Sequence, residues 1–449
     1  MNIWYVNHYA SPPGKGRGER PLHIARALKR LGHSPLIVAA SHHHLQFTMG
    51  DSGPVEAGTE AVAGAGAGAG TEQGAIPFRF IATRAYASNG GLRRLLGMLD
   101  FAKGVGRLVE AVGAAGGVSA GRMDRPDVII CSSPHPFAFP AVQRLAQTLG
   151  ARVVFEERDL WPLSLVEIAG VSRWHPLVLW MQRIVTRAYR NADAVVSLLP
   201  KARDHMVGLG MDPERFNHIP NGVSIESWEA SDSELPAEHE AVFDRLRAEG
   251  KLIVVYTGSM GEPNALDQIL GLPDAEGTEG GDVPFHFVLI GEGALSEALQ
   301  KRVVDEGISY VSFLPAVPKE RVRRALALAD VCFIGWNDRS IYRFGISANK
   351  IFDYFLAGKP VLHAVNAGND PVAEAEAGLS VAPYEPAELR EALRAFVAMS
   401  AEERRAMGER GREFVLAHHN WEVLGRRYAR VCEGLVASPP AAGHPTTQA

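Results

Sequence analysis

One pattern runs through the chain twice: a short apolar strand, a turn that contains glycine, and then an amphipathic helix. Residues 3–6 read as a strand, a Pro/Gly loop follows at 7–18, and a predicted helix at 19–31 leads to a strand at 35–40. The same alternation restarts with a strand at 252–257. Strands and helices that alternate in this way form parallel sheets with helices on both faces. The sequence therefore predicts an α/β fold with two doubly wound domains.

The remaining elements continue this alternation. Further strands are expected at 128–131, 152–156, 194–197, 285–290, 310–313, 331–334 and 361–365, and further helices at 92–110, 349–357 and 421–436. The first domain is expected to span 1–222 and the second 251–420, joined by a charged, patternless linker at 223–250. Two low-complexity stretches, the insertion 51–74 with its GAGAGAG repeat and the tail 437–449, are expected to be disordered.

Composition excludes several classes of function. A net charge of -5 over 449 residues gives no global attraction to nucleic acid. The three cysteines lie far apart in apolar contexts without a C-x-x-C pair, so we expect small buried hydrophobes rather than a metal site or disulfide. No run of about 18 apolar residues exists, and the chain begins directly in a strand. We therefore expect a cytoplasmic protein in a reducing environment.

The segment 342–363, YRFGISANKIFDYFLAGKPVLH, predicts a tight loop, a short helix and a buried strand. Gly358 suits the left-handed position after the helix, and Pro360 prevents its continuation. Lys350 lies in the first helical turn, where the helix dipole disfavours a cation unless an anion also binds there. Asp353 follows one turn later on the same face. A helix start, a lysine and a carboxylate in one turn suit a nucleotide diphosphate with its ribose.

Glycine-rich turns follow three predicted strands. Gly258-Ser259 and Gly291-Glu292-Gly293 either let the backbone approach a ligand closely or serve only as turns. The loop 14–18, GKGRG, either cradles an anion with its backbone N–H groups or is a flexible loop with solvated cations. It matches neither a Walker loop nor a dinucleotide fingerprint. Because ligands bind at the carboxyl ends of strands in such sheets, we favour a functional role for all three turns.

Four motifs together resemble one enzyme family. They are the FGxSxNKxFDYxxAGKPV pattern within 342–363, the strand, loop and helix at 3–33, the E-x-R-D-L-W-P segment at 156–162, and I-P-N-G-V at 219–223. These motifs resemble the retaining glycosyltransferases of family 4, which have the GT-B fold. Within that family they are closest to a bacterial polysaccharide branch that often handles N-acetylated aminosugars on a UDP carrier. The resemblance extends from residue 2 to about 435.

The resemblance implies a fold and a separate binding role for each domain. Two Rossmann-like domains would face a central cleft, the first binding the acceptor and the second the nucleotide sugar, with the last helix packing back across the linker. The donor site would comprise Gly16, Gly18, Gly258, Ser259, Gly291, Gly293, Leu314, Ser347, Asn349, Lys350 and Asp353. Catalysis would fall to Lys350, Arg343, Asp159 and Arg158. The partners would be a nucleotide sugar, which is a co-substrate rather than a cofactor, and a saccharide or lipid-linked acceptor.

The chain departs from the family pattern at three positions. Ser259 and Glu262 stand where the family has an Arg and a Lys that bind phosphate, and Gly345 stands where it has an acid. This leaves Lys350, Arg343 and backbone N–H groups to carry the diphosphate charge. Because of these departures, a catalytically weak partner subunit that binds sugar nucleotides stays open as an alternative. Among enzymes, the alternative is a nucleotide-sugar 2-epimerase on the same fold.

Three further features each allow two interpretations. Arg158-Asp159 is either a structural ion pair or part of the site near the transferred sugar. The His42-His43-His44 run is a polar loop rather than a metal site, because adjacent side chains point apart, and no Asp-x-Asp exists to hold a metal-bridged diphosphate. The helix at 92–110 has basic residues on one side and leucines on the other. We expect it to be half-buried, with peripheral contact to the inner membrane face as the alternative.

Overall fold

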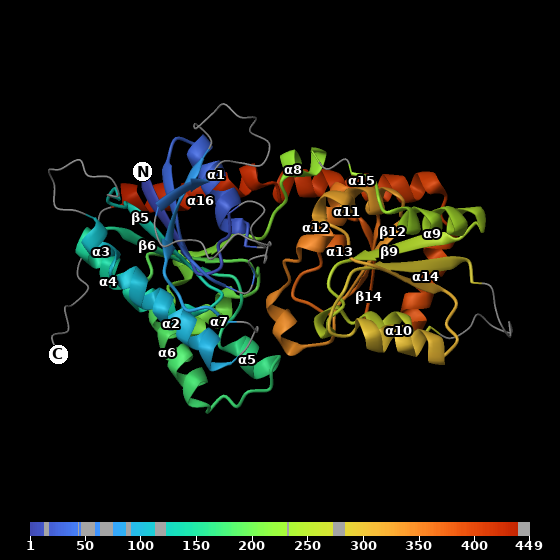
Figure 1. Cartoon of the computed structure of the whole chain (residues 1–449), viewed down its shortest axis with the longest axis horizontal. Helices are drawn as coiled ribbons and strands as arrows, with labels where there is room; N and C mark the ends of the chain where they lie inside the picture. Colours follow the sequence, from blue (N-terminus) through green and yellow to red (C-terminus); the bar gives the residue numbers. More distant parts are fainter. Residues whose placement is uncertain are drawn as a thin grey trace. The chain divides into compact units, whose positions relative to one another are not determined.

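The computed structural model describes residues 1–12, 18–43, 45, 59–62, 75–86, 91–112, 123–230, 233–272 and 283–438 (Figure 1). Gly16, His44 and most of the stretches 51–74 and 437–449 lie outside these residues. The chain divides into two compact units. Unit 1 is Met1–Pro220 together with the chain from Trp421 onward, and unit 2 is Asn221–Asn420. Each unit is described by itself.

Unit 1 is built on an 8-stranded sheet with the order β3-β4-β2-β1-β5-β6-β7-β8. Every pair in it is parallel except β3 with β4. Its strands are β1 (Asn2–Asn7), β2 (Ser34–Ala40), β3 (Thr59–Val62), β4 (Ile76–Ile81), β5 (Val128–Ser132), β6 (Arg152–Glu157), β7 (Ala194–Ser197) and β8 (Phe216–His218). Its helices are α1 (Arg20–Arg30), α2 (Leu92–Gly106), α3 (Leu108–Ala111), η2 (Pro136–Ala138), α4 (Phe139–Leu149), α5 (Leu163–Glu167), α6 (Pro176–Asn191), α7 (Arg203–Gly208), η3 (Pro213–Arg215) and α16 (Trp421–Ala437).

Unit 2 is built on a 6-stranded parallel sheet with the order β11-β10-β9-β12-β13-β14. Its strands are β9 (Leu252–Thr257), β10 (Phe285–Ile290), β11 (Val311–Leu314), β12 (Val331–Gly335), β13 (Val361–Ala364) and β14 (Gly378–Val381). Its helices are α8 (Ile225–Glu229), α9 (Ala237–Ala248), η4 (Glu262–Asn264), η5 (Leu266–Ile269), α10 (Ser296–Asp305), α11 (Lys319–Ala327), η6 (Ser340–Phe344), α12 (Asn349–Leu356), α13 (Pro371–Glu374), α14 (Pro386–Ala398) and α15 (Ala401–His418). The predicted doubly wound α/β architecture is therefore confirmed.

Each sheet is covered by helices on both faces (Figure 1), which explains why strands such as β1 and β9 are almost entirely buried. In unit 1, α1 and α16 pack with one face, and aromatic contacts of Phe155 with Phe139 of α4 and Tyr189 of α6 lie on the other. In unit 2, the expected apolar face of α12 is confirmed because Ile351 and Phe355 are completely buried. Gly358 has the predicted left-handed conformation, with a φ of 64°.

A buried polar network holds unit 1 together around Glu156 of β6. One carboxylate oxygen accepts hydrogen bonds from Tyr5 Oη (2.6 Å) and Ser132 Oγ (2.7 Å), and the other accepts from Arg20 Nη2 (2.9 Å) and Tyr428 Oη (2.5 Å). Arg20 also donates to the carbonyl oxygens of residues 219 and 220. Burial alone would raise the pKa of Glu156, but the Arg20 charge and these hydrogen bonds outweigh it and lower the pKa to about 2.

Four expectations about local structure need correction. The supposed linker 223–250 contains α8 and α9 and belongs to unit 2, because Phe243 and Leu246 of α9 are completely buried. Residues 59–62, inside the supposedly disordered insertion, form β3 against β4. The turn after β9 leads into the 3₁₀ helices η4 and η5 rather than an α-helix.

The expected helix at 92–110 is interrupted at Arg107 and forms α2 and α3. Its buried face is Met98, Phe101 and Val105, whereas the leucines expected to form the apolar side are half-buried or exposed. The helix is thus half-buried, as favoured, but through a different set of residues. Among the described residues, no helix is both long enough and apolar enough to span a membrane.

Replacing Glu156 by Gln should strongly destabilise unit 1. The substitution leaves the buried Arg20 guanidinium without its counter-ion, which typically costs about 3–5 kcal/mol, and it places an amide N–H among donors. For a unit of this size we expect the melting temperature to fall by roughly 10 °C in a thermal unfolding experiment. The matched control is Asp100→Asn, which breaks the exposed Arg84–Asp100 pair and should cost under about 1 kcal/mol. Equal shifts in the two variants would show that the Glu156 network does not stabilise the fold.

Candidate functional site

Each sheet contains one point where the direction of its connections reverses. In unit 2 the chain runs from β9 outward to β10 and β11, and then returns to β12 on the other side of β9. In unit 1 the same reversal lies between β1 and β5. Open α/β sheets bind ligands outside the carboxyl ends of the strands at such switch points. The residues that follow β9 and β12, and those that follow β1 and β5, are therefore the candidate sites.

The switch point of unit 2 holds the predicted Lys350. Its Nζ lies 2.5 Å from Tyr256 Oη, at the end of β9, and 2.6 Å from Asn264 Oδ1, in the segment that follows. Tyr256 Oη and Asn264 Nδ2 both donate to the carbonyl oxygen of Ser259, at 2.5 and 2.9 Å. The orientation of both partners is thus fixed, so that each presents oxygen to the ammonium group. We call Tyr256, Ser259, Asn264 and Lys350 the lysine cradle.

The lysine cradle holds a cation without neutralising it. Burial lowers the pKa of Lys350 to about 8, because its partners are a phenol and an amide rather than a carboxylate. Among the described residues, none of the carboxylates forms an ion pair with Lys350 Nζ. A buried and uncompensated ammonium group is costly in the free protein. An anion bound beside it would remove that cost.

The N-terminus of α12 adds a second source of positive potential. Its N-cap residue, Ala348, makes no side-chain capping bond, and the first turn contains no acidic residue. The first backbone N–H groups of a helix lack partners within the helix, so this end favours an anion. Asn349 is exposed at the first position, and Ser347 precedes it. Ser347 Oγ accepts the N–H of Asn221 (2.9 Å), and its carbonyl oxygen accepts from Asn221 Nδ2 (3.0 Å), which ties this turn to the start of unit 2.

The predicted glycine turns pack against the lysine cradle and against each other. A Cβ at Gly258, where φ is 130°, would lie 2.5 Å from Lys350 Cε. A Cβ at Gly291, where φ is 151°, would lie 1.9 Å from the carbonyl oxygen of Gly258. Gly293 lies against the backbone of Met260 in the same way. Close packing therefore accounts for these glycines, and their contact with a ligand stays a prediction.

The departures from the family pattern have visible consequences. Glu262, which stands where the family has a lysine, forms an ion pair with Arg339 and accepts a hydrogen bond from Asn337 Nδ2 at 3.3 Å. Arg339 was missed by the sequence analysis, although it follows the strand β12 by only a few residues. The predicted Arg343 is exposed in η6, where its guanidinium group lies 4.2 Å from the ring of Phe344. The structure thus adds one cation, Arg339, to the segments that follow β9 and β12.

Three other predicted positions lie on the same elements. Asp353 is half-buried on α12, one turn after Asn349. Leu314 ends β11, and its carbonyl oxygen accepts the N–H of Gly291 at 3.1 Å. Gly345, at the position of the missing acid, has a φ of 106° and closes the η6 turn by donating to the carbonyl oxygen of Tyr342. The backbone there adopts a conformation that an acidic residue would rarely take.

The switch point of unit 1 holds a cluster of buried histidines that sequence reasoning missed. His8 follows β1, His135 follows β5, and the two rings lie 4.9 Å apart. His43, after β2, lies 6.4 Å from His8. Burial, assisted by the charge of Arg94, lowers the pKa of His135 to about 3, so its imidazole is neutral. Neither ring nitrogen of His135 has a hydrogen-bond partner among the described residues, which leaves one donor and one acceptor available.

The remaining predicted residues of unit 1 lie near this edge. The carbonyl oxygen of Gly18 accepts the N–H of Ser11 at 3.2 Å. Arg158 and Asp159 follow β6, and the Arg158 N–H donates to Ser133 Oγ at 2.8 Å, whereas the Asp159 side chain is exposed. Both positions are at the carboxyl ends of strands, as expected, and their role stays a prediction.

His42 and His43, the described residues of the histidine run, have separate partners. His42 Nε2 accepts the N–H of Tyr86, and His43 Nε2 lies 3.3 Å from the carbonyl oxygen of Ala10. Across the described parts of the chain, no group of three or more His, Cys, Asp or Glu residues is arranged to hold a metal ion. All three cysteines are buried free thiols, as their apolar contexts indicated.

Comparisons with known proteins show which families and folds the chain resembles. A family model described as "Glycosyl transferase 4-like domain" matches residues 15–222, and one described as "Glycosyl transferase-like" matches residues 277–429. A search of curated proteins by sequence gave no match. Among solved structures, sucrose-phosphate synthase from Thermosynechococcus elongatus superposes with a TM-score of 0.68 at 15% identity, covering 97% of this chain and 99% of the other.

Two further structures have the same fold at similarly low identity. Anabaena HepE, in complex with UDP and glucose, gives a TM-score of 0.61 at 14% identity, covering 97% of this chain and 100% of the other. WaaG, a glycosyltransferase involved in lipopolysaccharide biosynthesis, gives 0.60 at 15% identity, also covering 97% and 100%. The two family models between them match most of the chain, and both units have the matching topology. The chain is therefore a glycosyltransferase with the GT-B fold, and its residues 15–222 match a family 4-like domain.

Proposed function

We propose that this enzyme transfers a sugar, of the hexosyl or N-acetylaminosugar type, from a UDP carrier to a hydroxyl of a saccharide or lipid-linked acceptor, with retention of configuration and without a metal. The observation that carries the proposal is the lysine cradle at the switch point of unit 2, beside the uncapped N-terminus of α12. UDP is chosen because HepE, of the same fold, was crystallised with UDP and with UDP-glucose. The aminosugar is suggested by the motif in 342–363.

The donor diphosphate would bind where positive charge is least compensated. The Lys350 ammonium group and the first N–H groups of α12 would contact its phosphate oxygens, and Arg343 would supply further charge. Asp353 would accept hydrogen bonds from the ribose hydroxyls. As the bond to the sugar breaks, negative charge grows on the leaving phosphate, and preorganised donors stabilise that charge more than they stabilise the bound substrate. Lys350, held in place by Tyr256 and Asn264, is such a donor.

The acceptor would bind at the switch point of unit 1. His135 offers a neutral ring with an available donor and acceptor, which suits hydroxyl groups of a sugar. Arg158, Asp159 and the 14–18 loop would complete this side. Transfer would proceed on one face of the donor sugar, with the leaving phosphate taking the proton of the acceptor hydroxyl. This mechanism requires no nucleophile from the protein, and none is assigned.

The choice of nucleotide is tested by thermal unfolding with UDP, GDP, dTDP and ADP. A ligand at about 100 times its dissociation constant stabilises the folded state by about 2.7 kcal/mol, so UDP should raise the melting temperature clearly. The shift should be unchanged by EDTA, because the cradle supplies the charge that a metal supplies elsewhere. A shift that EDTA abolishes would contradict the metal-free mechanism. The absence of a shift with any of these nucleotides would favour the weak partner subunit.

Lys350→Ala should lower kcat by about a hundredfold or more, because it removes a donor to the leaving phosphate. The rate is measured with a UDP-sugar donor and a saccharide acceptor. Conversion of the UDP-sugar to its 2-epimer is also followed without acceptor, since an epimerase would convert the donor alone. Lys301→Ala is the matched control, because Lys301 is exposed on α10 and pairs with Asp305 at the surface. A wild-type rate in the Lys350 variant would remove this residue from the mechanism.

UDP binding should take up a proton above pH 8. Lys350 has a pKa of about 8 in the free enzyme, and a bound diphosphate favours the ammonium form and raises that pKa. As the pH rises above 8, affinity should therefore fall by up to roughly tenfold per pH unit until the raised pKa is reached. Titration calorimetry in buffers of different ionisation enthalpy measures the uptake. Lys350→Arg is the control, because a guanidinium group stays charged; equal uptake in that variant would assign the proton to another group.

A further inference from the structure

A basic surface lies in unit 1, on α6 and the loop before it. Residues 168–192 contain four arginines and no acidic residue, in a chain whose net charge is -5. Three of these arginines, Arg183, Arg187 and Arg190, are exposed on α6. At 100° per residue they lie within about 80° of one another and of Trp180, on one face of the helix. The surface is therefore a local concentration of positive charge on a negatively charged protein.

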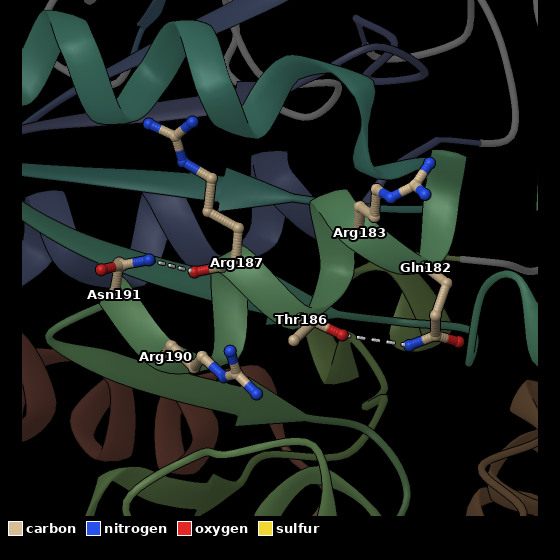
Figure 2. A pocket seen from close by; sticks show the side chains of 6 residues that line it. All are labelled: Gln182, Arg183, Thr186, Arg187, Arg190 and Asn191. Atoms are coloured by element: carbon tan, nitrogen blue, oxygen red, sulfur yellow. Dashed lines mark hydrogen bonds between the residues drawn. The ribbon is translucent and has the colours of Figure 1, made fainter. Parts of the chain in front are cut away.

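The arginines surround a surface hollow of about 340 Å³, which is also lined by Gln182, Thr186 and Asn191. Figure 2 shows the guanidinium groups of Arg183 and Arg187 extending to one side of the helix and that of Arg190 to the other. Arg187 Nε donates to Gln143 Oε1 of α4 (2.6 Å), and Arg190 Nε donates to the carbonyl oxygen of Leu209 (3.2 Å). These bonds orient two of the guanidinium groups, which remain exposed and able to contact phosphate oxygens.

Exposed tryptophans accompany the arginines. Trp174 is 69% exposed and Trp180 is 40% exposed, and Ile168 in the same segment is also exposed. The turn that carries Trp174 is ordered, because the N–H groups of Trp174 and His175 donate to Ser172 and the His175 side chain caps α6. The Arg173 guanidinium lies 4.9 Å from the Trp174 ring. An ordered turn thus presents a large aromatic side chain to solvent just before the helix that carries the three arginines.

We infer that this surface, formed by residues 168–175 and the exposed face of α6, docks the protein on an anionic phospholipid bilayer. Tryptophan is enriched at membrane–water interfaces because its ring is amphipathic, and arginines near the surface are attracted to anionic headgroups. Four cations are fewer than the six to ten phosphate contacts typical of a protein that binds duplex DNA firmly, and exposed indoles have no role there. A bilayer matches both the charge and the aromatic groups.

This docking surface differs from α2, which the sequence suggested for membrane contact. On α2 the best-exposed leucine is Leu92, which is 70% exposed, and Arg93 beside it is also exposed. These two side chains resemble Trp174 and Arg183 in exposure and type, so they provide a matched control. The inference does not depend on the proposed catalytic function, because vesicle binding and UDP binding are measured separately.

The test is co-sedimentation of the full chain with vesicles of phosphatidylcholine alone or mixed with phosphatidylglycerol. The wild-type protein should bind the anionic vesicles more tightly, and added salt should weaken binding. Losing one arginine alone should reduce the affinity about fivefold. The double variant Trp174→Ser, Arg183→Gln should therefore lose more than fivefold, while its UDP-induced melting shift stays unchanged. Neither side chain is buried, so the variant should fold.

The control variant Leu92→Ser, Arg93→Gln should keep wild-type binding to the same vesicles. An equal or larger loss in this control would overturn the assignment to α6. Equal binding of the wild-type protein to neutral and anionic vesicles would also overturn it. So would binding of duplex DNA that depends on Trp174 and Arg183 while vesicle binding does not.

Discussion

The ion pair between Arg20 and Glu156 connects parts of the chain that are far apart in sequence. Glu156 lies near the end of the central strand β6, and Arg20 begins α1. The Arg20 guanidinium group also donates to the carbonyl oxygens of residues 219 and 220, where the chain leaves unit 1. Tyr428 brings in the last helix. A buried pair of this kind is weak evidence for net stability, but breaking it leaves an isolated charge in the core. The network therefore determines where the chain leaves unit 1 and where it returns.

Lys350, the buried cation of unit 2, has neutral partners instead. Arg20 contacts a carboxylate, whereas Lys350 contacts a phenol and an amide. The first arrangement neutralises charge inside the fold, and the second preserves charge at the edge of a sheet. Groups held in this strained electrostatic state are concentrated at functional sites, because the missing counter-ion is supplied by the ligand. This contrast separates the structural polar groups of the protein from those that we assign to the donor.

The departures from the family pattern can be understood in the same terms. Glu262 replaces an expected cation, but it pairs with Arg339 and so positions another cation after β12. Gly345 replaces an expected acid in a backbone conformation that favours glycine. Each departure is accommodated locally, which is why the doubly wound fold and the position of Lys350 are the same as the motif predicts.

Most strands of the two sheets and several helices could be predicted from the sequence, but β3, β4, β8 and β14 were missed. Parallel strands are buried on both faces, so each is a continuous apolar run, and α12 shows its buried face through Ile351 and Phe355. Helix α9 was missed because its apolar positions are sparse and lie in a highly charged stretch. The buried face of α2 was wrong because the leucines outnumber Met98, Phe101 and Val105, yet only packing decides which face is covered. The histidine cluster was missed because His8 and His135 are 127 positions apart.

By itself, the sequence determined the fold class, most of the strands and the presence of a cation at the start of α12, because these depend on periodicity and local turn chemistry. The tertiary structure decided the surroundings of that cation. Tyr256 and Asn264 lie 94 and 86 positions before Lys350, and only the switch point of the sheet brings them together. Burial and neutral partners, not residue type, lower the pKa of Lys350, and these are properties of packing that no local pattern records.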